Sequence, residues 1–235
     1  MAVTLSSLTA NNSTTDNTSF VTASVSPTAN RTILVTVCGV SAGTNVNPTI
    51  SGLGATWTTL QTAGGSGSNT VGRVVRTFST LSDGTSGTIT IDWGATTQAR
   101  CFWSVSEIVN SLGDYSYAKV QGVSNTRNSG GGSISTYSVT LSAFADAANL
   151  TYGALHFSSA SAATPGSGFT ELSDTNVEIQ FLEDEYKDGQ DTSVDWSFAS
   201  ADGQATALAL ELTGTPIILG GSSPMFFSTG GVTVG

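Results

Sequence analysis

The chain has 235 residues, of which only 10% are charged, and its 17 acidic side chains outnumber the 7 basic ones to give a net charge of −10. This charge argues against nucleic acid and anionic membranes as partners, because both attract basic surfaces. No stretch approaches the roughly 18 consecutive apolar residues of a membrane-spanning helix. The first residues contain neither a basic region nor a long apolar one, so we expect no secretory signal.

Along the chain, the patterns predict strands and turns and no regular helix. Residues 1–17 are polar with one short alternating run, which indicates an N-terminal arm or an edge strand. Residues 33–40 form a nearly continuous apolar run, which is typical of a strand packed in a sandwich core. The other predicted strands of the chain are 19–25, 56–60, 71–81, 137–143, 150–158, 169–173, 177–186, 193–198 and 205–213.

A long internal repeat organises these strands. A strand that ends in Asp92-Trp93 returns as one that ends in Asp195-Trp196, and the apolar strand after each closes on Glu107 or Glu211. The matching halves cover residues 18–110 and 137–214. The period of about 100 residues is too long for a solenoid, so it indicates a duplicated half-domain or two related sandwiches.

The predicted fold is therefore all-β, an antiparallel two-sheet sandwich of about 8–10 strands, with a jelly roll as the natural closed form of two similar halves. We expect the sandwich to cover residues 18–214, with a linker at 111–136 that includes the Gly-rich stretch 129–133. The short linker favours one interleaved jelly roll over two tandem sandwiches. Both arrangements remain open.

Residues 215–235 form a Gly- and Pro-punctuated segment with several large apolar side chains, which predicts an extended C-terminal arm. Apolar surface of this extent indicates that the arm lies on the chain's own sandwich or on a neighbouring subunit. As subunit contacts we predict Val3, Leu5, Ile217, Ile218, Leu219, Met225, Phe226 and Phe227.

Cysteine and histidine supply little chemistry. Cys38 and Cys101 both fall in apolar strand patterns, and without an export signal two reduced thiols are favoured over a disulfide. His156 is the only histidine, which excludes a metal site built from several histidines. Because it lies in an apolar strand, we expect a packed or surface strand histidine and no catalytic triad.

The densest acidic cluster runs from Glu178 to Asp191. Glu183 and Glu185 would share one face of a strand, as paired carboxylates do in glycosidases, and Ca²⁺ binding is a second alternative. A solvated acidic edge is favoured over both, because Lys187 and Gly189 are typical of an exposed hairpin end.

Repetition favours structural roles for two further sets of residues. Glu107 and Glu211 recur in both halves, which indicates that each bonds the backbone of a turn, since an active site needs two different groups. Five aromatic residues mostly recur and are expected in the core: Trp57, Trp93, Trp103, Phe169 and Trp196. A sugar-binding platform, if one exists, is expected at Tyr115, Tyr117 and Tyr137. We predict no catalytic residue, no metal ligand and no cofactor.

The first half carries a series of soft motifs: Ala29-Asn30-x-Thr32, the strand Leu34-Val35-Thr36-Val37, Gly52-Leu53-Gly54-x-x-Trp57-Thr58, Gly87-Thr88-Ile89-Thr90-Ile91 and the apolar strand that closes on Glu107. This series resembles a jelly-roll domain of tailed-bacteriophage virion proteins, which include capsid decoration (cement) proteins, head fibres and tail appendages. The resemblance covers roughly residues 18–214 and transfers no catalytic residue.

The resemblance implies a non-enzymatic capsid decoration protein that assembles in the host cytoplasm and becomes part of the virion. Its expected partners are the major capsid protein and copies of itself, as a homotrimer at threefold positions of the shell, with terminal arms crossing between subunits. The alternatives are a tail or fibre component of the virion and a carbohydrate-binding or adhesin module.

Overall fold

The computed structural model describes residues 3–42, 46–65, 72–127, 132–159 and 161–217. In these ranges all regular structure is β, in antiparallel sheets, so the predicted all-β sandwich architecture is confirmed. The described residues contain no helix that could cross a membrane.

The first sandwich has a five-stranded inner sheet and a three-stranded outer sheet. The inner sheet runs in the order β1 (Val3–Ser13), β8 (Arg100–Asn110), β3 (Thr32–Ser41), β6 (Gly72–Leu81) and β5 (Thr58–Gly65). The outer sheet runs in the order β2 (Ser19–Val21), β7 (Ile89–Asp92) and β4 (Thr49–Gly52). This arrangement, in which β1, β8, β3 and β6 face β2, β7 and β4, has the strand order of a jelly roll. β5 extends the inner sheet at β6.

The second sandwich repeats this order strand for strand. Its inner sheet consists of β9 (Tyr115–Arg127), β15 (Ser193–Pro216), β11 (Leu150–Ser159), β14 (Gln180–Lys187) and β13 (Thr170–Val177). The outer strands are β10 (Ile134–Thr140) and β12 (Thr164–Pro165). The long β15 serves both layers, because residues 193–201 pair with β10 and β12 while residues 205–216 pair with β9.

The chain thus contains two jelly rolls in tandem, and its strands outnumber the 8–10 that the sequence led us to expect. β9 occupies much of the expected linker 111–136, so the repeats begin at β1 and β9, not at residues 18 and 137. Both strands lie at sheet edges with one face largely exposed, which leaves their sequences free to differ. Residues 128–131 of the predicted Gly-rich linker lie outside the described residues.

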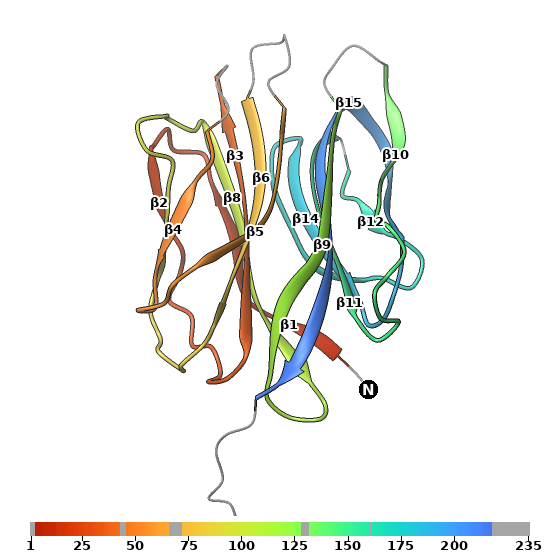
Figure 1. Cartoon of the computed structure of the whole chain (residues 1–235). Coiled ribbons are helices and arrows are strands. Elements are labelled where there is room, and N and C mark those ends of the chain that lie inside the picture. Colours follow the sequence, from red (N-terminus) through yellow and green to blue (C-terminus); the bar gives the residue numbers. More distant parts are fainter. Residues whose placement is uncertain (1–2, 43–45, 66–71, 128–131, 160, 218–235) are drawn as a thin grey trace, which may run out of the picture.

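The two inner sheets pack face to face, with the outer strands β2 and β4 on one side of the molecule and β10 and β12 on the other (Figure 1). Apolar side chains from both sheets fill the space between them and form a central core, which includes Leu34, Phe102, Leu150, Leu182 and Leu210. A second and a third apolar core lie inside the individual sandwiches.

Edge strands of the inner sheets lie beside each other at both seams of the central core. β1 lies beside β13, and its repeat β9 lies beside β5, so exchanging the halves reproduces the arrangement. At one seam the Asn12 side-chain amide donates to the Asn176 carbonyl at 3.0 Å, and at the other the Lys119 ammonium donates to the Leu60 carbonyl. This pseudo-twofold arrangement covers four sheet edges that would otherwise be available for aggregation.

Candidate functional site

The described surface is hollowed at the end of the first sandwich, where two adjoining depressions of about 450 and 460 Å³ share Thr56, Thr58, Thr80 and Leu81. We call them together the threonine groove. One depression continues along residues 116–119 of β9, so the groove crosses from the first sandwich to the second. Its remaining lining residues are Thr32, Ile33, Leu53, Gly54, Ala55, Thr59, Leu60, Ser79, Ser82, Asp83, Thr85, Ser116, Tyr117, Ala118 and Lys119.

Hydroxyl groups dominate the groove, and Leu81 supplies exposed apolar surface at its middle, with 46% of the residue accessible. The charged side chains that line it are Asp83 and Lys119. Asp83 accepts the Thr85 backbone N–H at 2.8 Å, and its hydrogen bonds to Thr85 lower the pKa of its carboxyl. The lining therefore offers no pair of groups for acid–base catalysis, and it suits an uncharged occupant.

A strained turn shapes one wall of the groove. Gly52, Leu53 and Gly54 all have positive φ, which is unusual for the bulky Leu53. A Cβ on Gly52 would come within 2.3 Å of the Thr88 carbonyl, so only glycine fits there. The turn is held by the Trp57 indole, which donates to the Gly52 carbonyl at 3.4 Å.

The described chain ends beside this groove. Thr215 of β15 pairs with Ser116, which lines the groove, and the Ile217 N–H donates to the Asp114 carbonyl at 3.0 Å. The C-terminal segment therefore leaves β15 next to the threonine groove. The predicted contact residues Ile218, Leu219, Met225, Phe226 and Phe227 lie outside the described residues.

The prediction that Val3 and Leu5 contact another subunit has to be corrected. Both side chains are buried in the central core of their own chain, with exposed fractions of 1% and 7%. The cause is the alternation of β1, which directs these two residues toward the second sandwich. They leave almost no surface for a neighbouring copy.

The preferred interpretation of the acidic cluster as a solvated edge is wrong at its centre, because Glu183, Asp184 and Glu185 are all buried. β14 lies between β11 and β13, and both of its faces are covered. Asp184 points into the central core and accepts hydrogen bonds from Ser104 Oγ (2.9 Å), from the Tyr152 hydroxyl (3.0 Å) and from Ser173 Oγ. Burial raises the pKa of Asp184 to about 6, although these donors oppose the shift.

The Asp184 contacts are part of a polar network that ties the two sandwiches together. The Tyr152 hydroxyl also lies 2.6 Å from Thr36 Oγ1, which is 2.8 Å from Thr77 Oγ1. Thr36 and Thr77 belong to the first inner sheet, whereas Tyr152 and Asp184 belong to the second. A buried network with its partners in place fixes the register of the two sheets.

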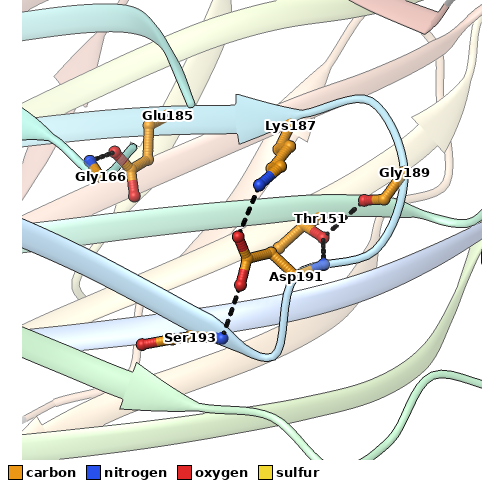
Figure 2. A network of polar contacts seen from close by, with 7 residues as sticks. All are labelled: Thr151, Gly166, Glu185, Lys187, Gly189, Asp191 and Ser193. Carbon is orange, nitrogen blue, oxygen red and sulfur yellow. Dashed lines mark hydrogen bonds and ion pairs between the residues drawn. The ribbon is translucent and has the colours of Figure 1, made fainter. Parts of the chain in front are cut away.

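Glu183 and Glu185 point the other way, into the core of the second sandwich. Glu185 Oε2 accepts the Gly166 N–H at 3.2 Å (Figure 2), whereas neither Glu183 oxygen has a hydrogen-bond partner among the described residues. Burial raises the pKa of Glu185 to about 8 and that of Glu183 well above its usual range. Both carboxyls are inaccessible, which argues against a glycosidase site. The described residues also contain no group of acidic, histidine or cysteine side chains arranged to hold a metal.

The recurring glutamates bond turn backbones, as predicted. Glu107 Oε2 accepts the Thr28 N–H at 2.8 Å, and Glu211 Oε1 accepts the Ala145 N–H at 2.9 Å. Each of these turns precedes the central strand of its inner sheet. Glu107 also forms an ion pair with Arg31 at 2.5 Å. Glu211 bonds its turn in the same way, but its other hydrogen-bond partners differ from those of Glu107.

Three further predictions concern single side chains. Cys38 and Cys101 are free and buried, and His156 is a fully buried strand histidine packed edge-on against Phe102, so the predictions for these residues are confirmed. Trp93, Trp103 and Trp196 are buried core residues as predicted, and Trp57 and Phe169 are partly buried against the outer cores.

The three tyrosines named for a sugar platform do not form one. Tyr117 is buried and its hydroxyl accepts the Asn110 side-chain amide at 2.8 Å, while Tyr137 is buried in the second sandwich. Tyr115 is partly buried against the central core. Sequence reasoning missed the threonine groove, whose only signal is the accessible Thr residues at positions 56, 58, 59 and 80. Comparisons with protein-family models, curated proteins and solved structures give no match.

Proposed function

We propose that this chain is a non-enzymatic structural protein of a bacteriophage virion, and specifically a capsid decoration protein that binds the assembled shell. Two observations support the proposal besides the sequence resemblance. The two jelly rolls are joined by a large core and a buried polar network, which makes the chain a stiff building block. The C-terminal segment leaves that block beside an exposed, nearly uncharged groove.

The position of the chain exit beside the threonine groove carries the proposal. Residues 218–235 contain no charged side chain, and they include five of the eight predicted contact residues. Fully extended, a segment of this length reaches about 60 Å, which is enough to cross to a neighbouring molecule. We propose that the segment of one copy occupies the threonine groove of the next. An uncharged contact suits copies that each carry a net charge of −10, since it adds no repulsion of its own.

A head-to-tail contact of this type can close into a ring around a symmetry axis. The resemblance implies three copies, so we propose a homotrimer on the shell, with the major capsid protein as the second partner. Three copies held together bind the shell at three sites at once, which raises their combined affinity well above that of a single copy.

The function is tested on purified particles of the phage that encodes this chain. Quantitative mass spectrometry should find the chain in the particles in a fixed ratio to the major capsid protein. Shells assembled without it should take up the purified chain, and should then resist heating better. A chain that stays in the soluble fraction and does not bind such shells would rule out the decoration function.

The groove is tested with a matched pair of substitutions. Leu81→Asp puts a charge in the middle of the groove, whereas Ile179→Asp puts the same charge on another exposed aliphatic position, at the turn between β13 and β14. Sedimentation velocity should show dissociation of the assembly for Leu81→Asp alone. Equal behaviour of the two variants would refute the groove as the contact.

A carbohydrate-binding module is the second candidate function, because the same hydroxyl-lined groove offers hydrogen-bonding groups to a neutral sugar. A glycan array probed with the full chain separates the two candidates. Glycan binding that is lost in Leu81→Asp, together with a monomeric chain, would favour the module over the decoration protein.

A further inference from the structure

Two acidic side chains lie inside the second sandwich with no compensating charge. Glu183 and Glu185 occupy alternate positions of β14 and therefore share one face of it. On the neighbouring strand they lie opposite Leu155 and Gly153, whose own face packs into the core of this sandwich. Both residues have an exposed fraction of 0%.

The elements packed around this pair add further acidic groups. From β13, Asp174 lies opposite Glu183 and Glu171 lies opposite Glu185. Asp184 contributes its charge from the other face of β14, and Asp195 and Asp191 contribute from the segment that follows β14. Each of these carboxylates favours the neutral form of the pair.

Only weak donors oppose this acidic surrounding. The Gly166 N–H bonds Glu185, and the Trp196 indole lies near Glu183 and slightly favours its ionised form. The nearest basic side chain along the strand is Lys187, which forms an ion pair with Asp191 at 2.7 Å (Figure 2). The Lys187 ammonium also lies over the Phe169 ring. Among the described residues, the pair has no cation of its own.

A buried carboxylate without a cation or a set of donors is far less stable than the neutral acid in the same place. We propose that the second sandwich folds around Glu183 and Glu185 as protonated, neutral carboxyl groups, and that this half of the molecule loosens when rising pH removes their protons. The first sandwich lacks this dependence, so the chain carries a pH-sensitive half joined to an insensitive one.

The first sandwich serves as an internal control because the repeat places other residue types at the same positions. In register with Glu183 and Glu185 it has Arg76 and Phe78 on β6, which lie opposite Val37 and Val35 of β3. The Arg76 guanidinium bonds the Pro48 carbonyl at 2.9 Å and Thr59 Oγ1 at 2.9 Å. This site therefore holds a basic and an aromatic side chain where the second sandwich has two buried carboxyl groups.

The sign of the effect follows from the raised pKa values. A glutamate that keeps its proton in the folded state but loses it in the unfolded state stabilises the fold fully below its unfolded pKa, which is near 4.5. That stability declines as pH rises and is lost once pH passes the folded pKa, which is about 8 for Glu185. In this window the opening equilibrium of the sandwich shifts about tenfold per pH unit for each proton released.

Hydrogen exchange of the full-length chain between pH 5 and pH 9, followed by mass spectrometry, tests this proposal. After correction for the intrinsic exchange rate, peptides of β11 and β14 should lose protection at least tenfold per pH unit up to about pH 8, whereas peptides of β3 and β6 should not. Glu183→Gln and Glu185→Gln should each reduce this slope, and the exposed control Asp188→Asn should leave it unchanged. Equal pH dependence in both sandwiches, or an undiminished slope in both glutamine variants, would overturn the proposal.

A measurement on the unmodified chain covers the case in which a glutamine variant does not fold. The infrared C=O stretch of a protonated carboxyl is distinct from that of a carboxylate, so the full-length chain at pH 7 should show it. The signal should disappear as the second sandwich opens at alkaline pH. A folded chain without any protonated carboxyl signal at pH 7 would refute the proposal independently of any variant.

Discussion

The Glu211 carboxylate gives the sharpest test of how the repeat is held together. It is fully buried in the inner-sheet part of β15 and accepts hydrogen bonds from the Ala145 N–H (2.9 Å) and from the side-chain amides of Asn149 and Gln121 (both 2.6 Å). Gln121 keeps a second acceptor in the Ser142 carbonyl, but the other two donors have no replacement in these contacts. Each hydrogen bond to a charged group contributes about 1.5–3 kcal/mol, so Glu211→Ala should lower the free energy of unfolding by about 3–5 kcal/mol.

Glu211→Gln refines this prediction, because the amide oxygen can keep both bonds of Oε1 while its NH₂ group faces the Gln121 amide. The expected loss is about 1–2 kcal/mol. Urea unfolding monitored by tryptophan fluorescence measures both variants, since Trp196 lies in the second sandwich and the other three tryptophans lie in the first. A loss below about 1 kcal/mol for Glu211→Ala would refute the structural role.

Three other substitutions or reactions test separate parts of the structure. Asp184→Ala leaves the hydroxyls of Ser104, Ser173 and Tyr152 without their common acceptor in the central core. Calorimetry should therefore show a free energy of unfolding that is lower by about 2–4 kcal/mol. An unchanged melting temperature would contradict the polar network. Gly153→Ala would place a Cβ 2.4 Å from Val194 Cγ1. In the same assay it should lower the free energy of unfolding by about 1–3 kcal/mol. An unchanged stability would contradict the close packing of β11 against Val194, in the first part of β15. Cys38 and Cys101 are buried with raised pKa values, so neither should react with a thiol reagent at pH 8 until the chain is unfolded, and rapid labelling of the native chain would show that these thiols are accessible.

The fold class could be predicted because the strands of both sandwiches show a regular spacing of apolar residues and because their sequence patterns recur in the two halves. The matching of Asp92-Trp93 with Asp195-Trp196 correctly identified corresponding strands, β7 and the first part of β15. The beginnings of the halves could not be found in this way, because β1 and β9 expose one face and share no pattern. Their equivalence is a property of sheet order, which depends on pairing across the whole domain.

The acidic strand shows where local pattern fails. Three consecutive acidic residues, Glu183, Asp184 and Glu185, ordinarily indicate a segment exposed to solvent. The sequence alone gives no sign of the sheets that cover both faces of β14. The repeat did contain a usable signal, since β14 corresponds to β6, a strand that lies between two others. The threonine groove has no comparable signal, because it forms where separate strands of both sandwiches meet.

Because the two sandwiches are joined by an internal pseudo-twofold arrangement, they form a single structural unit. Separated halves would expose the apolar faces of the central core and the edges of β1, β5, β9 and β13. The threonine groove remains exposed on the joined pair of sandwiches.

The proposed contact between copies is tested most directly by the mass of the purified protein in solution. Light scattering should be measured on the full chain and on a chain ending at Ile217, which keeps the pairing of Thr215 and Pro216 with β9 intact. The full chain should have the mass of a trimer and the shortened chain that of a monomer. The same mass for both chains would contradict assembly through the C-terminal segment.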